Sequence, residues 1–172
     1  GESKSTLGIV PKTYILWKSA QEARAKKDPD SLKKALEYLK ELEAYDNSDA
    51  EVVLAIAKVN YDLRQYGDAM VGYKRALQLD PSLKDDPDLI AQLVDGIDSG
   101  SSKDAMSIIV ELIGNSAESR LREAAAKGDK KTSKNAWIAL EELWRLKIEA
   151  NPTDYDAMLS LANARFRLDE AK

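Results

Sequence analysis

Residues 50–83, AEVVLAIAKVNYDLRQYGDAMVGYKRALQLDPSL, decide the fold class of this chain. Their apolar residues recur at intervals of three and four, which places them on one face of an α-helix. The stretch contains two such runs, so we expect helices at about 49–64 and 67–79. Pro81 ends the second helix, because proline lacks a backbone N–H and clashes with the preceding turn. This segment therefore predicts two helices joined by a short turn.

The same spacing continues through most of the chain, and neither an alternating apolar run nor an Asn-Gly turn indicates a strand. Further helices are expected at about 12–26, 29–44, 87–97, 131–150 and 154–168, from Ser101 to Gly114, and from Asn115 to about Gly128. Their starts are marked by Pro11, by Asp28 before Pro29, by Ser48 with Glu51 as a capping box, by Asp86 before Pro87, by Ser101 with Asp104 and by Asn115 with Glu118. We therefore predict an all-α protein.

Length and composition exclude several function classes. The 172 residues suit one domain, and 44% hydrophobic beside 33% charged residues favour a folded chain. Because the chain has no Cys and no His, disulfides, thiolate nucleophiles, HExxH metal sites and Ser–His–Asp triads are impossible. A net charge of −4 gives no basic surface for nucleic acid, and no apolar run approaches the roughly 20 residues that span a bilayer. We predict no cofactor, no metal, no nucleic-acid partner and no membrane insertion; the cytoplasm is favoured, although a chain without thiols suits any compartment.

Residues 50–83 resemble a tetratricopeptide repeat (TPR), a helix–turn–helix unit of about 34 residues. The residues that carry the resemblance are Ile56, Ala57, Tyr61, Leu63, Tyr66, Ala69, Tyr73, Ala76, Leu77 and Pro81. The resemblance implies that Ala57 and Ala69 are small where the two helices cross, and that Tyr73 fills the gap to the next unit. Asn60 and Val53 depart from the family, which more often carries an aromatic and a large residue there.

The rest of the chain is expected to continue this architecture. Residues 12–46 resemble a degenerate TPR unit, 86–150 resemble HEAT or armadillo helices, and 151–172 resemble the start of another TPR unit. With 1–10 as a flexible lead-in, 11–172 would form a single α-solenoid domain with a concave inner wall. The last helix would have no following helix to cover its apolar residues, which predicts that the chain is a fragment of a longer protein.

In repeats of this kind the first helix of each unit supplies the inward-facing residues. Here those residues are Glu51, Leu54, Lys58, Tyr61 and Asp62, the predicted partner-binding set. The alternative is an ordinary solvated face with a half-buried Tyr. We expect Lys58 and Asp62 to face solvent, so that Lys58→Glu and Asp62→Lys change partner binding while leaving stability within about 0.5 kcal/mol. The Lys and Asn that clamp chaperone tails in some TPR domains are replaced by Leu54 and Lys58, so such binding is not predicted.

Three other features of the sequence have structural interpretations. Trp137 and Trp144 lie on one stripe with Leu140 and Ile148, which favours core packing over a binding hot spot. The basic groups Lys26-Lys27, Lys33-Lys34 and Lys130-Lys131 with Lys134 alternate with acids and do not predict a nucleic-acid groove. The acids Asp85, Asp86 and Asp88 suggest a capped loop and lack the calcium-loop pattern.

These observations favour a non-catalytic scaffold or regulatory module that binds a peptide or protein in its concave groove. The combination of repeats resembles segments attached to bacterial signalling proteins. Self-association through the open C-terminal repeat, giving a homodimer, is the first alternative. A carboxylate-dependent hydrolase is the second.

The repeat alignment makes a quantitative prediction about stability. Tyr73→Ala should lower the free energy of unfolding by about 3–5 kcal/mol, because it empties a large core site. Ala69→Leu should cost about 1–3 kcal/mol, because it overpacks the helix crossing. Urea denaturation measures both, and values within about 0.5 kcal/mol of wild type for the two variants would contradict the alignment.

Overall fold

The computed structural model of the protein describes residues 10–170, and every regular element in that range is helical. The all-α prediction is therefore confirmed. The helices are α1 (Lys12–Ala25), α2 (Pro29–Tyr45), α3 (Ala50–Asp62), α4 (Tyr66–Leu79), α5 (Pro87–Gly96), α6 (Ser102–Ser107), α7 (Glu118–Lys127), α8 (Lys130–Ala150) and α9 (Tyr155–Glu170). The expected lead-in at 1–10 lies, apart from Val10, outside the described residues.

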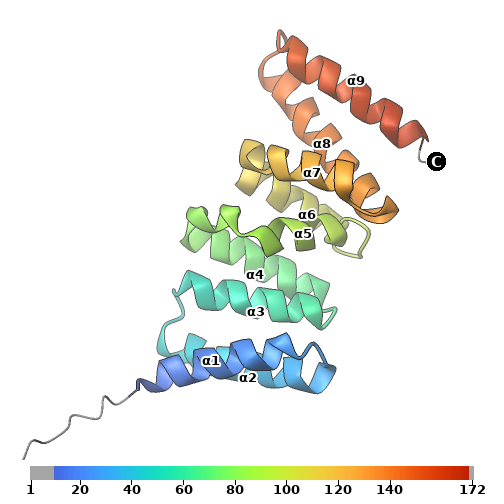
Figure 1. Ribbon diagram of the computed structural model, residues 1–172. Helices are drawn as coiled ribbons and strands as arrows, with labels where there is room; N and C mark the ends of the chain where they lie inside the picture. Colours follow the sequence, from blue (N-terminus) through green and yellow to red (C-terminus); the bar gives the residue numbers. More distant parts are fainter. Residues whose placement is uncertain (1–9, 171–172) are drawn as a thin grey trace, which may run out of the picture.

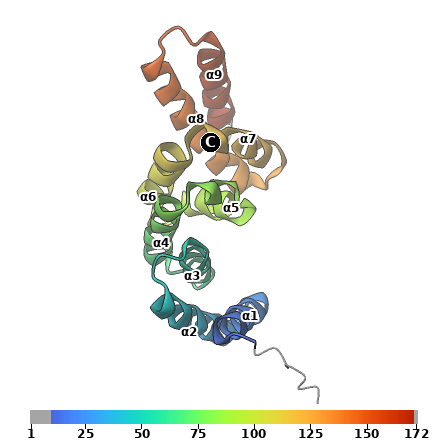
Figure 2. The ribbon, with the colours of Figure 1, turned by 90° about the vertical axis from the view of Figure 1, so that its left-hand side faces the viewer.

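The helices follow one another along one direction in chain order, from α1 to α9 (Figure 1). Seen from the side, α1, α3, α5 and α7 lie on one side of the stack and α2, α4 and α6 on the other, and the stack is curved (Figure 2). Most helices pack mainly against their neighbours in the sequence, with α3 against α4 and α1 against α2 as the most extensive pairs, whereas α5 contacts α8 more than any other helix. Odd-numbered helices are thus brought side by side although about thirty residues separate them in the chain.

Aspartates begin most of the helices by accepting hydrogen bonds from N–H groups that have no partner in the first turn. The Asp28 carboxylate accepts from Ser31 N at 2.9 Å, Asp86 from Leu89 N at 3.0 Å and Asp129 from Thr132 N at 2.7 Å. Hydrogen bonding to the N–H groups and hydroxyls of the residues that follow them lowers the pKa of the Asp28 and Asp129 carboxyls. The expected starts at Asp28 and Asp86 are confirmed.

The capping box expected at Ser48 and Glu51 is wrong. Asp49 caps α3 instead, since its carboxylate accepts from Glu51 N at 3.0 Å and Val52 N at 3.2 Å. The Ser48 hydroxyl donates to Asp46 Oδ1 at 2.6 Å and is therefore committed to the preceding turn. A carboxylate one position later in the chain accepts a stronger, charge-assisted bond than a hydroxyl does.

The two helices expected at 101–128 are also different in the structure. After α6 the chain widens into a π-helical segment η2 (Ile108–Ile113) and then a 3₁₀ turn η3 (Gly114–Ala117), and neither Ser101 nor Asn115 caps a helix through its side chain. A π-helix aligns residues five apart, so Ile108 and Ile113 both reach the core. Gly114 has φ +58°, which glycine tolerates without a Cβ penalty. A second 3₁₀ turn, η1 (Pro81–Asp85), joins α4 to α5.

Helix α3 is apolar around most of its circumference and belongs to two hydrophobic clusters. One cluster contains Val52, Ala55 and Val59 with the apolar faces of α1 and α2. The other contains Val53, Leu54 and Ala57 and continues through α4 to α9. A helix that is covered on both sides in this way joins the two halves of the molecule.

Helices α3 and α4 cross at close range. A Cβ atom placed on Gly72 would lie 2.6 Å from Ala57 Cβ, well inside van der Waals contact. Ala57 and Ala69 are fully buried, as the repeat resemblance implied. Tyr73 is also fully buried, and its hydroxyl donates to Gln92 Oε1 on α5, so it bridges the two helix pairs. The sequence reading missed Gly72, whose missing side chain is what permits the contact.

We expect Gly72→Ala to destabilise the protein while Gly67→Ala, on the same helix, does not. Overpacking at Gly72 should cost about 1–3 kcal/mol and exceed the helix-propensity gain of up to about 1 kcal/mol. A Cβ at Gly67 meets nothing within 4 Å, so only the propensity gain applies there. Urea denaturation of both variants measures the difference, and equal midpoints would show that the crossing can relax.

Candidate partner-binding hollows

Three helices far apart in the sequence meet at a hollow of about 230 Å³, here called the α1–α3 hollow. Its lining includes Trp17, Gln21 and Arg24 from α1, Glu51, Leu54 and Lys58 from α3, and Asp88 from α5. Glu51, Leu54 and Lys58 are three members of the predicted set, so the structure does bring them together. The α1 residues were not anticipated, although their spacing of four and three along the helix places them on one face.

Lys58 does not face solvent as expected. Its side chain is only 10% exposed, and its Nζ lies 2.6 Å from Asp86 Oδ2 and 3.5 Å from Asp88 Oδ2. Asp86 also caps α5 with its other oxygen, so a single carboxylate fixes the start of α5 to the middle of α3. Lys58 is therefore a connection between two helices and not an open contact for a partner. No local pattern signals this, because Asp86 is 28 residues away in the chain.

Asp62 is likewise engaged within the molecule, which corrects the second solvent-facing expectation. Its side chain is 14% exposed, and Oδ2 accepts from Arg24 Nε at 2.9 Å and Lys27 Nζ at 2.8 Å. Gln92 Nε2 on α5 lies 3.5 Å from the other oxygen. Asp62 thus ties the end of α3 to the end of α1 and lies close to α5.

Tyr61 is half-buried and links α3 to α5. Its hydroxyl donates to Asp95, and the other Asp95 oxygen accepts from Lys131 Nζ on α8 at 2.7 Å. Its ring meets Tyr66 edge to face with centroids 5.2 Å apart. Leu54 is buried in the core, so Glu51 alone of the predicted set is exposed to solvent. Three of the five predicted residues therefore line the α1–α3 hollow, but most of the set is buried or engaged within the molecule.

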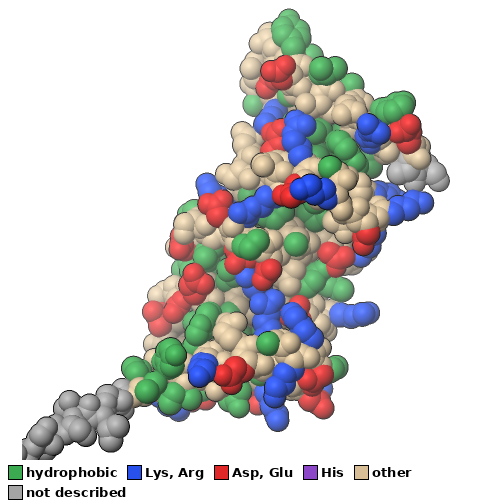
Figure 3. All heavy atoms as spheres, viewed as in Figure 1, with side chains coloured by type: hydrophobic (Ala, Val, Ile, Leu, Met, Phe, Trp, Pro, Cys, Tyr) green, Lys and Arg blue, Asp and Glu red, His purple; other side chains and the backbone are tan. Residues whose placement is uncertain are grey.

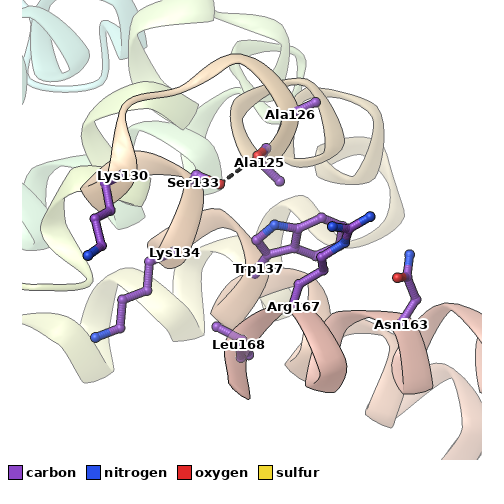
Figure 4. Close-up of a pocket in the computed structure, with 9 residues that line it drawn as sticks. All are labelled: Ala125, Ala126, Lys130, Ser133, Lys134, Trp137, Asn163, Arg167 and Leu168. Carbon is purple, nitrogen blue, oxygen red and sulfur yellow. Dashed lines mark hydrogen bonds between the residues drawn. The ribbon is translucent and has the colours of Figure 1, made fainter. Parts of the chain in front are cut away.

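A second hollow of about 460 Å³, here called the α8–α9 hollow, lies where α7, α8 and α9 meet (Figure 4). Lys130, Lys134 and Trp137 line it from α8, and Asn163, Arg167 and Leu168 line it from α9. Core packing was expected for both Trp137 and Trp144. Trp144 is indeed buried, with Nε1 donating to Glu118 Oε1 at 3.1 Å, but Trp137 is only half-buried and presents part of its ring to the hollow.

Hydrogen bonds from the first turns of α8 connect it to α7 and α5. Ser133 Oγ donates to Ala125 O at 2.6 Å near the end of α7 (Figure 4), and Asn135 Nδ2 donates to Val94 O at 3.0 Å near the end of α5. These bonds satisfy carbonyl groups in the last turns of two helices. The position of Trp137, one turn further along α8, is thereby fixed relative to α7.

Glu118 connects α7 to α8 below this hollow. Its carboxylate accepts hydrogen bonds from Trp144 Nε1, from Arg122 and from Lys147. Burial by itself would raise the pKa of Glu118, but these three bonds outweigh burial and lower the pKa below its ordinary value. A lowered pKa stabilises the fold above the unfolded-state pKa, and this contribution is lost as the pH falls through the folded-state pKa.

Neither hollow resembles a metal centre, and comparison gives no precedent. Across residues 10–170, no three acidic side chains come together in a way that would hold a metal ion. No helix in that range is both long enough and apolar enough to cross a membrane. Comparison with models of known families, with curated proteins and with solved structures found no match to this chain. Its function must therefore be inferred from the geometry of the two hollows.

Because Lys58 is paired with Asp86, its replacement should destabilise the protein, contrary to the expectation for a solvent-facing lysine. Lys58→Met keeps the apolar stem but leaves Asp86 without its cation, so it should lower the free energy of unfolding by about 1–3 kcal/mol. Asp88→Asn, at an exposed and longer contact, should change it by no more than about 0.5 kcal/mol. Chemical denaturation at neutral pH tests the pair. A Lys58→Met variant as stable as wild type would restore the view that Lys58 is open to solvent.

Proposed function

We propose that this chain is a non-catalytic module that binds a peptide or protein partner, and that its helix pairs form an α-solenoid of TPR-like and HEAT-like repeats. The stacking of helices in chain order supports the repeat architecture, as does the α3–α4 pair at residues 50–83. In such an array the hollows between helices of successive pairs are places where another chain can lie. A scaffold or regulatory role in a larger protein or assembly is consistent with this arrangement.

The observation that carries the proposal is the placement of two of the three tryptophans. Trp17 lines the α1–α3 hollow and Trp137 lines the α8–α9 hollow, and both are only partly buried. Tryptophan is enriched among the residues that dominate binding energy at protein interfaces. Trp144, by contrast, is buried and bonded to Glu118, as a purely structural tryptophan would be.

The carboxylates favour binding over acid–base catalysis. A general acid of the glycosidase type needs a raised pKa. Among the described acidic residues, those whose pKa is shifted have it lowered, because hydrogen bonds stabilise the ionised form: Asp28, Asp46, Asp80, Glu118, Asp129 and Glu142. The carboxylates of Asp62 and Asp86 are also paired with cations. A hydrolase is thus the less supported reading.

Site-specific photo-cross-linking tests the proposal. A photoreactive side chain at Gln21, which is exposed beside Trp17, should give discrete adducts with the partner in a cell lysate. The same group at Val71, 70% exposed on α4, should not. With the identified partner purified, Trp17→Ala should weaken binding by about tenfold or more, while Val71→Ala leaves it unchanged. Equal adducts from both positions, or none from Gln21, would refute binding at this hollow.

Self-association is the second candidate, because α9 presents large apolar side chains to solvent. Tyr155, Leu159 and Phe166 are 75%, 74% and 59% exposed, whereas α9 buries Ala157 and Ala164. Of the residues expected to lack a cover, Phe166 and Met158 are exposed, and Leu161 and Leu168 are half-buried. An apolar face of this kind favours contact with another helix. A photoreactive group at Leu159 that captured a second copy of the chain would favour this candidate.

A further inference from the structure

The α8–α9 hollow has an unusual balance of charge. Lys130, Lys134 and Arg167 line it, and its lining includes no acidic side chain. Neither lysine forms an ion pair with any residue between 10 and 170, and the nearest carboxylate oxygen of Glu170 is 3.7 Å from Arg167. Neighbouring cations outside the hollow are closely paired, such as Lys131 with Asp95 at 2.7 Å. Arg167 is thus ion-paired with Glu170, and Lys134 also lines an adjoining hollow that contains Glu141 and Asp169. The local excess of positive charge comes from Lys130 and Lys134.

This excess opposes the stability of α8. Lys130 and Lys134 are four residues apart, and their side chains extend in the same direction from successive turns (Figure 4). Like charges at this spacing destabilise a helix, and cations in the first turns also oppose the helix dipole. An anion bound between the Lys130 and Lys134 ammonium groups would offset this repulsion.

The same hollow offers apolar contact and hydrogen-bond donors. Trp137 and Leu168 are both half-buried, so part of each remains available. Trp137 Nε1 and the Asn163 amide form no hydrogen bond with another described residue. A volume of about 460 Å³ falls within the range of about 300–1,000 Å³ typical of ligand pockets. The site thus suits a ligand with carboxylates, an apolar side chain and backbone carbonyls.

We propose that the α8–α9 hollow binds a short acidic peptide segment of the partner, with its carboxylates at Lys130, Lys134 and Arg167 and an apolar side chain against Trp137 and Leu168. This inference rests on the proposed binding function and specifies its ligand. A nucleic acid fits less well, because the face in Figure 3 mixes acidic with basic side chains and the chain carries a net charge of −4. A phosphodiester chain needs a longer basic track than three cations provide.

Fluorescence anisotropy with the intact chain tests the charge requirement. The probe is a short fluorescein-labelled peptide with aspartates and glutamates around a central leucine–phenylalanine pair. The control peptide carries asparagine and glutamine in their place. The acidic peptide should bind at least about tenfold more tightly, and raised salt should weaken it. Equal binding of the two peptides would overturn the proposal, as would tighter binding of single-stranded DNA at the same lysines.

Matched variants locate the site. The Lys130→Glu, Lys134→Glu double variant should lose at least about tenfold in affinity. The Lys34→Glu, Lys103→Glu double variant carries the same change in net charge on exposed lysines of α2 and α6, and it should stay within about twofold. Unchanged binding by the first variant, once circular dichroism shows that it is folded, overturns the proposal.

Tryptophan emission gives a second readout that does not depend on the charge variants. Peptide addition should change the emission of the wild-type protein, and Trp137→Phe should abolish that change while Trp17 and Trp144 remain. An emission change that persists in Trp137→Phe places the peptide elsewhere.

Cross-linking from Gln21 does not involve the α8–α9 hollow, so the two proposals can fail separately. Retained cross-links without acidic-peptide binding would therefore overturn this inference alone, and lost cross-links with retained peptide binding would overturn binding at the α1–α3 hollow alone.

Discussion

Ala57 on α3 and Gly72 on α4 allow the two helix backbones to approach until a single methyl group fills the space between them. Tyr73, the next residue along α4, is thereby directed toward α5, where its hydroxyl meets Gln92. On the opposite side of α3, Ala55 and Val59 pack against α1 and α2. Because packed interiors deform little, this one contact distance constrains the helices on both sides of it.

Polar bonds, several of them partly buried, connect the successive layers of helices. Arg24 and Lys27 pair with Asp62, Lys58 with Asp86, Tyr61 and Lys131 with Asp95, and Lys147 with Glu118. The partners are 28 to 38 residues apart, about the length of one helix pair. Breaking a partly buried pair, such as Lys58 with Asp86, leaves one charge desolvated without a partner, which is costly. These bonds therefore discriminate against other ways of stacking the same apolar faces.

The two hollows differ in how their charges are balanced. In the α1–α3 hollow, Arg24 and Lys58 are neutralised by carboxylates from neighbouring helices. In the α8–α9 hollow, the lysines have no partner among the described residues, and the tryptophan beside them is half-buried. The first arrangement stabilises the stack itself, so a partner there would meet mainly Trp17, Gln21 and Glu51. The second leaves two lysines without a carboxylate partner among the described residues.

The sequence by itself determined what depends on local spacing. Helical periodicity predicted most of the helices, although not the π-helical and 3₁₀ segments after α6. Asp28 and Asp86 before prolines predicted two of the helix starts, and the repeat-like residues predicted that Tyr73 is buried. Tertiary structure alone decided which carboxylates meet Lys58 and Tyr61, and why Trp144 is buried while Trp137, seven residues earlier on the same stripe, lines a hollow. The physical reason is that periodicity specifies which face of a helix is apolar. How much of that face is covered, and which charged side chain meets it, depends on the positions of helices about thirty residues away in the chain.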